Sequence, residues 1–185
     1  MSSQQDPSVS AAIRDAATVT PSGKSLASQI DGVSTVSPVN HVDHRGRVFE
    51  IFAGESEHWA KPLTYCYAFT IRPGVVKGWG LHEKKDDRYT LITGEILVIL
   101  YDARVDSPTY GLVQKVTLTP EGVRQIRIPT GVWHMNVCLG DREAYLINHP
   151  TEVYVHGEPD RLLLPWDSKE IPVDLSQYFP PQHTN

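Results

Sequence analysis

The sequence predicts an all-β fold, either a sandwich or a barrel built from short strands. Three features point to this class. Runs of β-branched and aromatic residues recur along the chain, turn-forming residues separate them at intervals of roughly 8–12 residues, and no stretch of about 12 residues or more follows the helical period. Strands of this length and spacing are typical of sandwiches and barrels.

The predicted strands fill the middle of the chain. Thr93-Gly94 and Gly140-Asp141 each separate two strand-like runs and predict tight hairpins. Ser107-Pro108-Thr109 predicts a further turn with no chemical role. In chain order, the predicted strands are Thr64–Ile71, Arg88–Thr93, Glu95–Tyr101, Leu112–Leu118, Arg124–Ile128, Val132–Leu139 and Glu143–Asn148.

The strand Val132–Leu139 has two unlike faces, because side chains alternate along a strand. His134 and Asn136 share one face with Val132 and Cys138, and the other face is wholly apolar. This pattern favours a barrel wall between a ligand cavity and a packed layer. The alternative, in which the apolar face is core and the His134 face meets solvent, stays open.

The two ends differ in composition from the middle. Residues 1–24 are rich in Ser, Ala and Thr and hold almost no large apolar side chains, so we expect a flexible tail. A single domain over residues 25–178 is expected from the chain length of 185 residues. Residues 179–185 are expected to form a loose end.

Charge and cysteine content limit the partners. Seventeen Lys and Arg against 22 Asp and Glu give a net charge of −5, which argues against nucleic acid or an anionic membrane as the main partner. No apolar run approaches the roughly 20 residues of a membrane-spanning helix, and no signal peptide is visible. The two cysteines, Cys66 and Cys138, form no CxxC motif, so a cytoplasmic location is expected.

Four motifs follow one another in the chain: Asp43–Glu50, Gly80–His82, Tyr101–Gly111 and Arg124–His134. In combination they resemble the dTDP-4-dehydrorhamnose 3,5-epimerase family of cupin-fold enzymes. The resemblance implies a double-stranded β-helix jelly roll and a homodimer that shares strands across its interface. It also implies a nucleotide-diphosphate sugar substrate and no cofactor. These enzymes remove a proton next to the ketone of a 4-keto-6-deoxy sugar and return one from the opposite face.

The resemblance also implies roles for individual residues. His82 matches the catalytic base, and Asp167 in the late Trp-Asp pair matches the aspartate that orients it. Histidine suits a base because it titrates close to neutrality. The substrate-binding positions correspond to Arg45, Glu50, Lys77 and His134, and arginine suits a diphosphate through paired hydrogen bonds. A purely structural role, in which Arg45 holds Asp43 in a turn, stays open.

Two positions depart from the family pattern. Ile147 stands where the family has its acid tyrosine, so Tyr145 on the same strand is predicted as a substitute, with Tyr154 as a weaker one. Asp87 stands where the family has a lysine, and a carboxylate there would oppose an enolate. In the charged run HEKKDDR, we read Asp87 as part of a solvated loop.

Because of these departures, three functions remain in view. The leading one is a metal-free epimerase or isomerase that acts at one or both carbons beside the ketone. A second is a metal-dependent cupin, since His82, Asp87 and His134 follow the spacing of a two-histidine, one-carboxylate metal site. The third is a cupin that binds a sugar nucleotide without catalysis.

Overall fold

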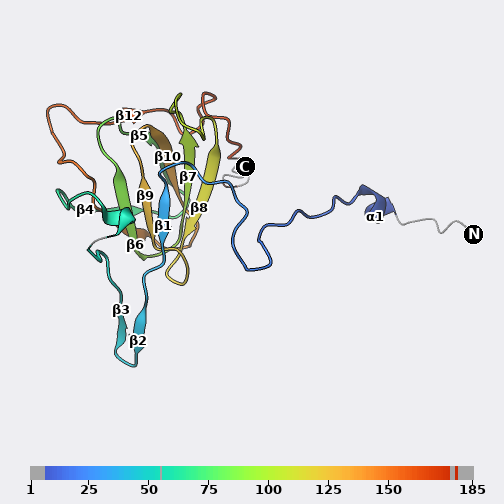
Figure 1. The fold of residues 1–185 in the computed structure, drawn as a ribbon, viewed down its shortest axis with the longest axis horizontal. Helices are drawn as coiled ribbons and strands as arrows, with labels where there is room; N and C mark the ends of the chain where they lie inside the picture. The colour runs from blue at the N-terminus through green and yellow to red at the C-terminus, as the bar shows by residue number, and fades with distance from the viewer. Residues whose placement is uncertain (1–6, 55, 176–177, 179–185) are drawn as a thin grey trace, which may run out of the picture.

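The computed structural model describes residues 7–54, 56–175 and 178, and it confirms the all-β prediction. Two antiparallel sheets of five strands face each other (Figure 1). The first sheet has the order β1 (Ser34–Val36), β9 (Gln125–Ile128), β6 (Asp87–Thr93), β11 (Ala144–Asn148) and β4 (Tyr67–Ile71). The second has the order β12 (Leu162–Leu163), β5 (Val76–Leu81), β10 (Val132–Cys138), β7 (Ile96–Asp102) and β8 (Val113–Leu118).

Three short elements lie outside the two sheets. The hairpin of β2 (His41–Asp43) and β3 (Gly46–Val48) pairs only with itself and projects away from the sandwich (Figure 1). The helix α1 (Pro7–Ala11) lies in the N-terminal segment that extends from the body, and the 3-10 turn η1 (Glu57–Trp59) precedes β4. In the described part of the chain, no helix has both the length and the apolar character needed to cross a membrane.

The strand predictions agree with the structure where residues alternate clearly. Each of the seven predicted segments contains one strand of the structure, and their ends differ by a few residues. These strands are β4, β6, β7, β8, β9, β10 and β11. The prediction missed β1, β2, β3, β5 and β12. In β5 two glycines interrupt the pattern, and this strand depends on pairing with β10 and β12. The expected loose end 179–185 and residues 1–6 of the expected tail lie outside the described residues.

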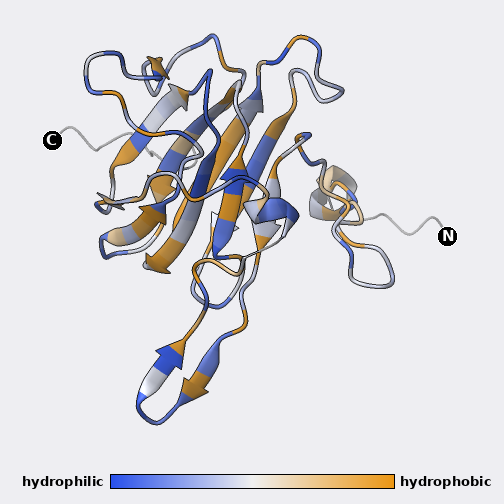
Figure 2. Ribbon diagram, turned by 60° about the vertical axis from the view of Figure 1, so that its left-hand side comes forward, coloured by the Kyte–Doolittle hydropathy of each residue, from blue (hydrophilic) through white to orange (hydrophobic). Residues whose placement is uncertain are grey.

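Two apolar layers hold the sandwich together. The larger fills the space between the sheets and includes Leu91, Val98 and Leu146. The smaller lies on the outer face of the second sheet, where Ile171 and Leu175 from the C-terminal segment cover it. The second sheet is therefore buried on both faces, which explains why β7 is an almost continuous apolar run. Hydrophobic residues recur along the strands of the two sheets (Figure 2).

Strand β10 separates the two kinds of surface as its alternation predicted. Met135 and Val137 face the outer apolar layer. His134 and Asn136 face inward and are only 5% and 4% exposed. The alternative in which the His134 face meets solvent is therefore wrong.

The motif Tyr101–Gly111 is a structural turn built around one buried carboxylate. Asp102 Oδ2 accepts hydrogen bonds from Ser107 Oγ at 2.6 Å and Thr109 Oγ1 at 2.7 Å. Arg104 binds both carboxylate oxygens, at 2.8 and 2.9 Å. Burial opposes the charge of Asp102, but these donors outweigh it and lower the pKa of its carboxyl group.

We expect Asp102→Ala to lower the free energy of unfolding by about 3 kcal/mol, because it leaves the partly buried guanidinium and two hydroxyls without their acceptor. Urea unfolding at pH 7 measures the change. Asp106→Ala is the matched control, since Asp106 is exposed in the same turn; its effect should stay within about 0.5 kcal/mol. Equal losses in the two variants would contradict the role given to Asp102.

Candidate active site

A pocket of about 450 Å³ opens between the two sheets. This volume lies within the range of about 300–1,000 Å³ common for small-molecule sites. The pocket is lined by side chains from β4, β5, β6 and β10 and from the segment between β11 and β12. They are Tyr65, Tyr67, Phe69, Lys77, His82, Lys85, Asp87, Tyr89, His134, Asn136, Tyr154, His156, Asp160 and Arg161, with Gly78.

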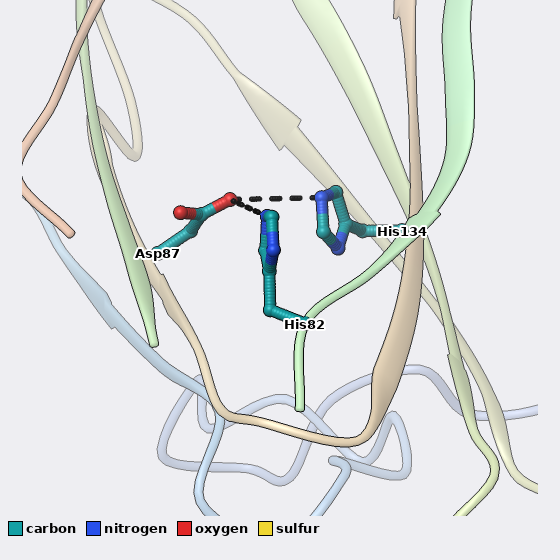
Figure 3. Close-up of side chains that lie close together, drawn as sticks. All are labelled: His82, Asp87 and His134. Carbon is teal, nitrogen blue, oxygen red and sulfur yellow. Dashed lines mark ion pairs between the residues drawn. The ribbon is translucent and has the colours of Figure 1, made fainter. Parts of the chain in front are cut away.

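Three buried polar residues meet in this pocket (Figure 3). The Nε2 atom of His82 lies 3.3 Å from Asp87 Oδ2, and His134 Nε2 lies 3.6 Å from the same oxygen. Asp87 begins β6 in the first sheet, whereas His134 lies on β10 and His82 follows β5 in the second. The cluster therefore forms only when the two sheets pack together.

The other ring nitrogen of each histidine faces a backbone carbonyl. His82 Nδ1 hydrogen-bonds to the carbonyl of Asp160, and His134 Nδ1 lies 3.3 Å from the carbonyl of Val132. A carbonyl oxygen can only accept, so Nδ1 carries a proton in both rings and Nε2 is directed at Asp87. Burial lowers the pKa of His134 to about 4, and His134 is therefore neutral at pH 7.

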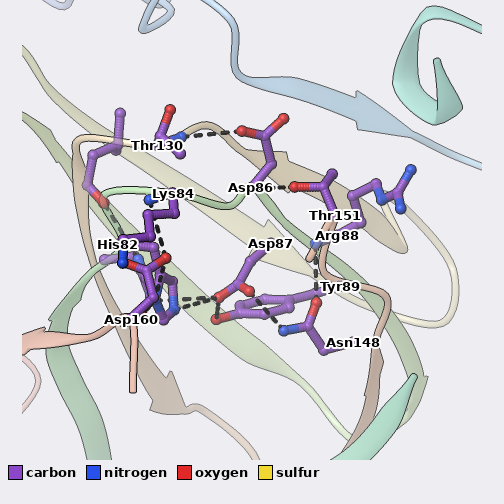
Figure 4. A network of polar contacts seen from close by, with 12 residues as sticks. His82, Lys84, Asp86, Asp87, Arg88, Tyr89, Thr130, Asn148, Thr151 and Asp160 are labelled. Atoms are coloured by element: carbon purple, nitrogen blue, oxygen red, sulfur yellow. Dashed lines mark hydrogen bonds and ion pairs between the residues drawn. The ribbon is translucent and has the colours of Figure 1, made fainter. Parts of the chain in front are cut away.

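Asp87 is held by two further donors (Figure 4). The hydroxyl of Tyr89 donates to Oδ2 at 2.9 Å, and the amide Nδ2 of Asn148 donates to Oδ1 at 2.8 Å. Burial opposes the charge of Asp87, but the hydrogen bond with His82, formed when that ring carries a proton on Nε2, and the hydrogen bond from Asn148 lower the pKa of the carboxyl group. Asp87 is ionised at neutral pH.

The interpretation of Asp87 as part of a solvated loop is wrong. Lys85, Asp86, Asp87 and Arg88 are each less than 5% exposed. Their charges are matched by distant partners: Arg127 Nη2 lies 2.9 Å from Asp86, and the Arg88 guanidinium donates to three backbone carbonyls. Burial of this run therefore depends on contacts that sequence spacing does not reveal.

The structure places the predicted partner of His82 elsewhere. Asp167 is exposed and lines a separate hollow beside Trp79. The segment between β11 and β12 contacts His82 through the carbonyl of Asp160 instead. The Asp160 carboxylate accepts hydrogen bonds from the backbone N–H groups of Glu83 and Lys84 at 2.9 and 3.0 Å, which fixes its carbonyl against the His82 ring.

The predicted substitute acid also lies outside the pocket. Strand β11 directs Ala144, Leu146 and Asn148 inward, so Tyr145 is on the outer face and 47% exposed. A contact with Glu143 raises the pKa of Tyr145. The weaker substitute, Tyr154, does line the pocket, where Lys85 Nζ lies 5.8 Å from its ring centre.

Of the predicted substrate-binding residues, His134 and Lys77 line the pocket. Lys77 Nζ lies 5.7 Å from the centre of the Phe69 ring. Arg45 lies in the turn of the projecting hairpin with 78% of its side chain exposed, and it holds Asp43 through its Nε atom at 3.1 Å. Glu50 is exposed beyond the same hairpin. Neither lines the pocket within this chain.

Several pocket residues had no assigned role in the sequence analysis. Asn136 had a usable signal, since it shares the face of His134, and its Oδ1 atom is buried without a hydrogen-bond partner among the described residues. The remainder come from loops or from strands whose inward face was not predicted. They are Tyr65, Tyr67, Phe69, Lys85, Tyr89, His156, Asp160 and Arg161. Asn148, which donates to Asp87 from β11, was likewise not predicted.

His82, Asp87 and His134 are also the described residues that could hold a metal ion, because their ligand atoms lie within 4.8 Å of one another. Two observations weigh against a cation. Protein donors already bind both oxygens of Asp87. Arg161 Nε and His134 Nε2 both lie 3.4 Å from the point where a side chain on Gly80 would begin, so a positive guanidinium lies close to the cluster.

Comparisons with known proteins place the chain in one group. The family model for dTDP-4-dehydrorhamnose 3,5-epimerase matches residues 27–183. A protein of Haloferax volcanii described as a probable low-salt glycan biosynthesis epimerase is 36% identical over 69% of this chain and 82% of its own. The spore coat polysaccharide biosynthesis protein SpsL of Bacillus subtilis is 32% identical over 81% of this chain and 99% of its own.

A solved structure supports the same grouping. The dTDP sugar isomerase of Desulfovibrio desulfuricans superposes with a TM-score of 0.73 at 27% identity. The match covers 80% of this chain and 92% of the other. It identifies the two facing sheets as those of a cupin-fold epimerase.

We expect the pocket to bind no divalent cation. A metal at 100 times its dissociation constant would stabilise the protein by about 2.7 kcal/mol. Elemental analysis should therefore find less than one ion per chain, and thermal melting should not change on adding Mn²⁺, Fe²⁺ or Zn²⁺ after treatment with EDTA. A rise in melting temperature that Asp87→Asn abolishes would contradict this prediction.

Proposed function

The chain belongs to the dTDP-4-dehydrorhamnose 3,5-epimerase family and is a nucleotide-sugar epimerase; on that premise, we propose how its pocket works. The substrate we propose is a 4-keto-6-deoxyhexose linked to a nucleoside diphosphate. The reaction is inversion at one or both carbons beside the ketone. One observation carries the proposal: a buried histidine, His82, directs Nε2 into a sugar-sized pocket beside an ionised carboxylate.

We propose His82 as the base. The carbonyl of Asp160 holds a proton on Nδ1, so Nε2 is the nitrogen that can accept the proton of the substrate, and it then hydrogen-bonds to Asp87. When Nε2 takes the proton from the carbon beside the ketone, the electrons of the C–H bond form the enolate. The negative charge of Asp87, 3.3 Å away, stabilises the imidazolium. Opposite charges at about this distance attract by about 4 kcal/mol at an effective dielectric of 20.

Positive side chains replace the missing lysine in this proposal. Arg161 and Lys77 line the pocket from two directions, and either charge would stabilise the enolate oxygen or a phosphate. The hydrogen bonds that Asp87 accepts from Tyr89 and Asn148 reduce the negative charge it presents to an enolate. Asn136, with its free Oδ1, would accept a hydrogen bond from a sugar hydroxyl.

The second subunit belongs to the proposal as well. Among the described residues, the β2–β3 hairpin pairs with no strand outside itself, and it exposes 72% of Val42 and 69% of Val48. We propose a homodimer in which this hairpin packs on the partner and brings Arg45 toward the nucleotide there, with Glu50 nearby. A cytoplasmic location, expected from charge and thiol content, completes it.

We expect deuterium from D2O to enter the substrate beside the ketone when the enzyme is incubated with dTDP-4-keto-6-deoxyglucose. NMR assigns the label to C3, C5 or both. His82→Gln should lower the exchange rate at least about 100-fold, because the base is removed. Asp167→Asn should stay within about threefold, because this carboxylate lies away from the ring. Binding of the nucleotide sugar without exchange in the wild type would favour the non-catalytic alternative.

The hairpin proposal makes a separate prediction. Sedimentation should give a dimer, and Arg45→Ala should raise KM for the nucleotide sugar about 10-fold with a smaller change in kcat, because a charge-assisted contact to phosphate is lost. Arg142→Ala is the control, an exposed arginine at the turn between β10 and β11. A monomer with an unchanged KM in Arg45→Ala would contradict the shared site.

A further inference from the structure

Inversion of a carbon needs a proton donor on the face of the sugar opposite the base. The family position for this donor holds Ile147, whose side chain has no proton to give. Tyr145 is on the outer face of β11. If the pocket inverts its substrate as proposed above, the donor must come from another strand.

The tyrosines that line the pocket differ in what their hydroxyls do. Tyr89 donates its proton to Asp87 Oδ2 at 2.9 Å and is 4% exposed, so this proton is engaged beside the base. Tyr154 is about as exposed as Tyr67, at 40% against 37%, but among the described residues no hydrogen bond orients its hydroxyl. No hydrogen bond orients the hydroxyl of Tyr65 within the described part of the chain.

Tyr67 differs from all three. Its hydroxyl oxygen accepts a hydrogen bond from Asn148 Nδ2 at 2.9 Å, which fixes the phenol and leaves its own proton free to point into the pocket. Tyr67 on β4 and Asn148 on β11 are directly opposite in the sheet, so their side chains share the inward face. The same Asn148 nitrogen lies 2.8 Å from Asp87 Oδ1. The support of the phenol is therefore part of the network that holds the base.

We propose that Tyr67 is the catalytic acid of this enzyme and delivers a proton to the enolate from the first sheet, opposite His82 on the second. His82 follows β5 and Tyr67 begins β4, and these two strands belong to different sheets on either side of the pocket. A sugar ring held between the sheets presents one face to each. This arrangement is what inversion requires.

The proton balance is complete without a co-reactant. His82 Nε2 takes the proton from one face of the carbon, and the C–H electrons become the enolate. The Tyr67 O–H bond then breaks, its proton forms the new C–H bond on the other face, and the ketone reforms. Tyr67 is left as phenolate and His82 as imidazolium, and exchange with water restores both for the next turnover.

The surroundings of Tyr67 suit both states of the phenol. Partial burial, with the charge of Asp87 adding to it, raises the pKa of Tyr67 to about 12, so the hydroxyl keeps its proton at neutral pH. Two groups favour the phenolate once it forms: the Asn148 amide that donates to its oxygen, and the positive charge of Arg161. A phenol also remains a stronger acid than the C–H bond beside a ketone.

The test is Tyr67→Phe, which removes the hydroxyl and keeps the ring. We expect deuterium exchange at the carbon that His82 deprotonates to stay within about threefold of wild type, while inversion, followed by NMR of the product, falls about 100-fold. His82→Gln should lose exchange and inversion together. Tyr145→Phe is the matched control on the outer face and should change neither rate.

The outcomes separate this proposal from the proposed function. No exchange in the wild type would overturn the function itself. Normal inversion by a folded Tyr67→Phe would overturn only the acid, as would a loss of inversion without loss of exchange in Tyr65→Phe or Tyr154→Phe. Should Tyr67→Phe melt early, Tyr67→His is the second variant: a ring that can donate a proton should recover part of the inversion, and full loss of it would count against the proposal.

Discussion

The structure depends on one buried charge, the carboxylate of Asp87. At 2% exposure it needs partners, since removing one partner of a buried charge costs about 3–5 kcal/mol. Those partners come from both sheets: Tyr89 and Asn148 from its own, His82 and His134 from the other. The site therefore assembles only when the two sheets pack together. A chain that brought the sheets together in another register would leave this charge without its two histidine partners.

The same network explains how a carboxylate can occupy the position of a lysine. A free negative charge near an enolate would oppose the reaction by about 4 kcal/mol. Here four protein groups surround the carboxylate, and its charge favours an imidazolium instead of facing the substrate alone. The positive charge of the pocket is moved to Arg161 and Lys77, on other segments. A lysine at this position would stabilise the enolate, whereas Asp87 stabilises the protonated base.

Alternation and turn residues were enough to predict seven of the strands and the inward face of β10, because both are local properties. The burial of Asp87 was not predictable in this way. A run such as HEKKDDR indicates solvent unless its partners are known, and Arg127, Asn148 and the His149 carbonyl are far away in sequence. The prediction of Asp167 as the partner of His82, where the structure has Asp160, has a similar cause, since the path of an irregular segment does not follow from its spacing.

The two-residue period of a strand also decides where an acid can be. On β11 the inward positions are Ala144, Leu146 and Asn148, so neither Tyr145 nor any side chain at residue 147 faces the substrate. In this sheet, a donor can reach the pocket only from an inward position of β11 or of a strand beside it. On β11 the inward position nearest the site holds Asn148. Its direct partners in the sheet are Tyr89 on β6, whose hydroxyl already donates to Asp87, and Tyr67 on β4. The hydrogen bond from the Asn148 amide to the Tyr67 hydroxyl links the two neighbouring strands and keeps the proposed donor in place. Both side chains are on the inward face of the sheet, so the outer face is not involved.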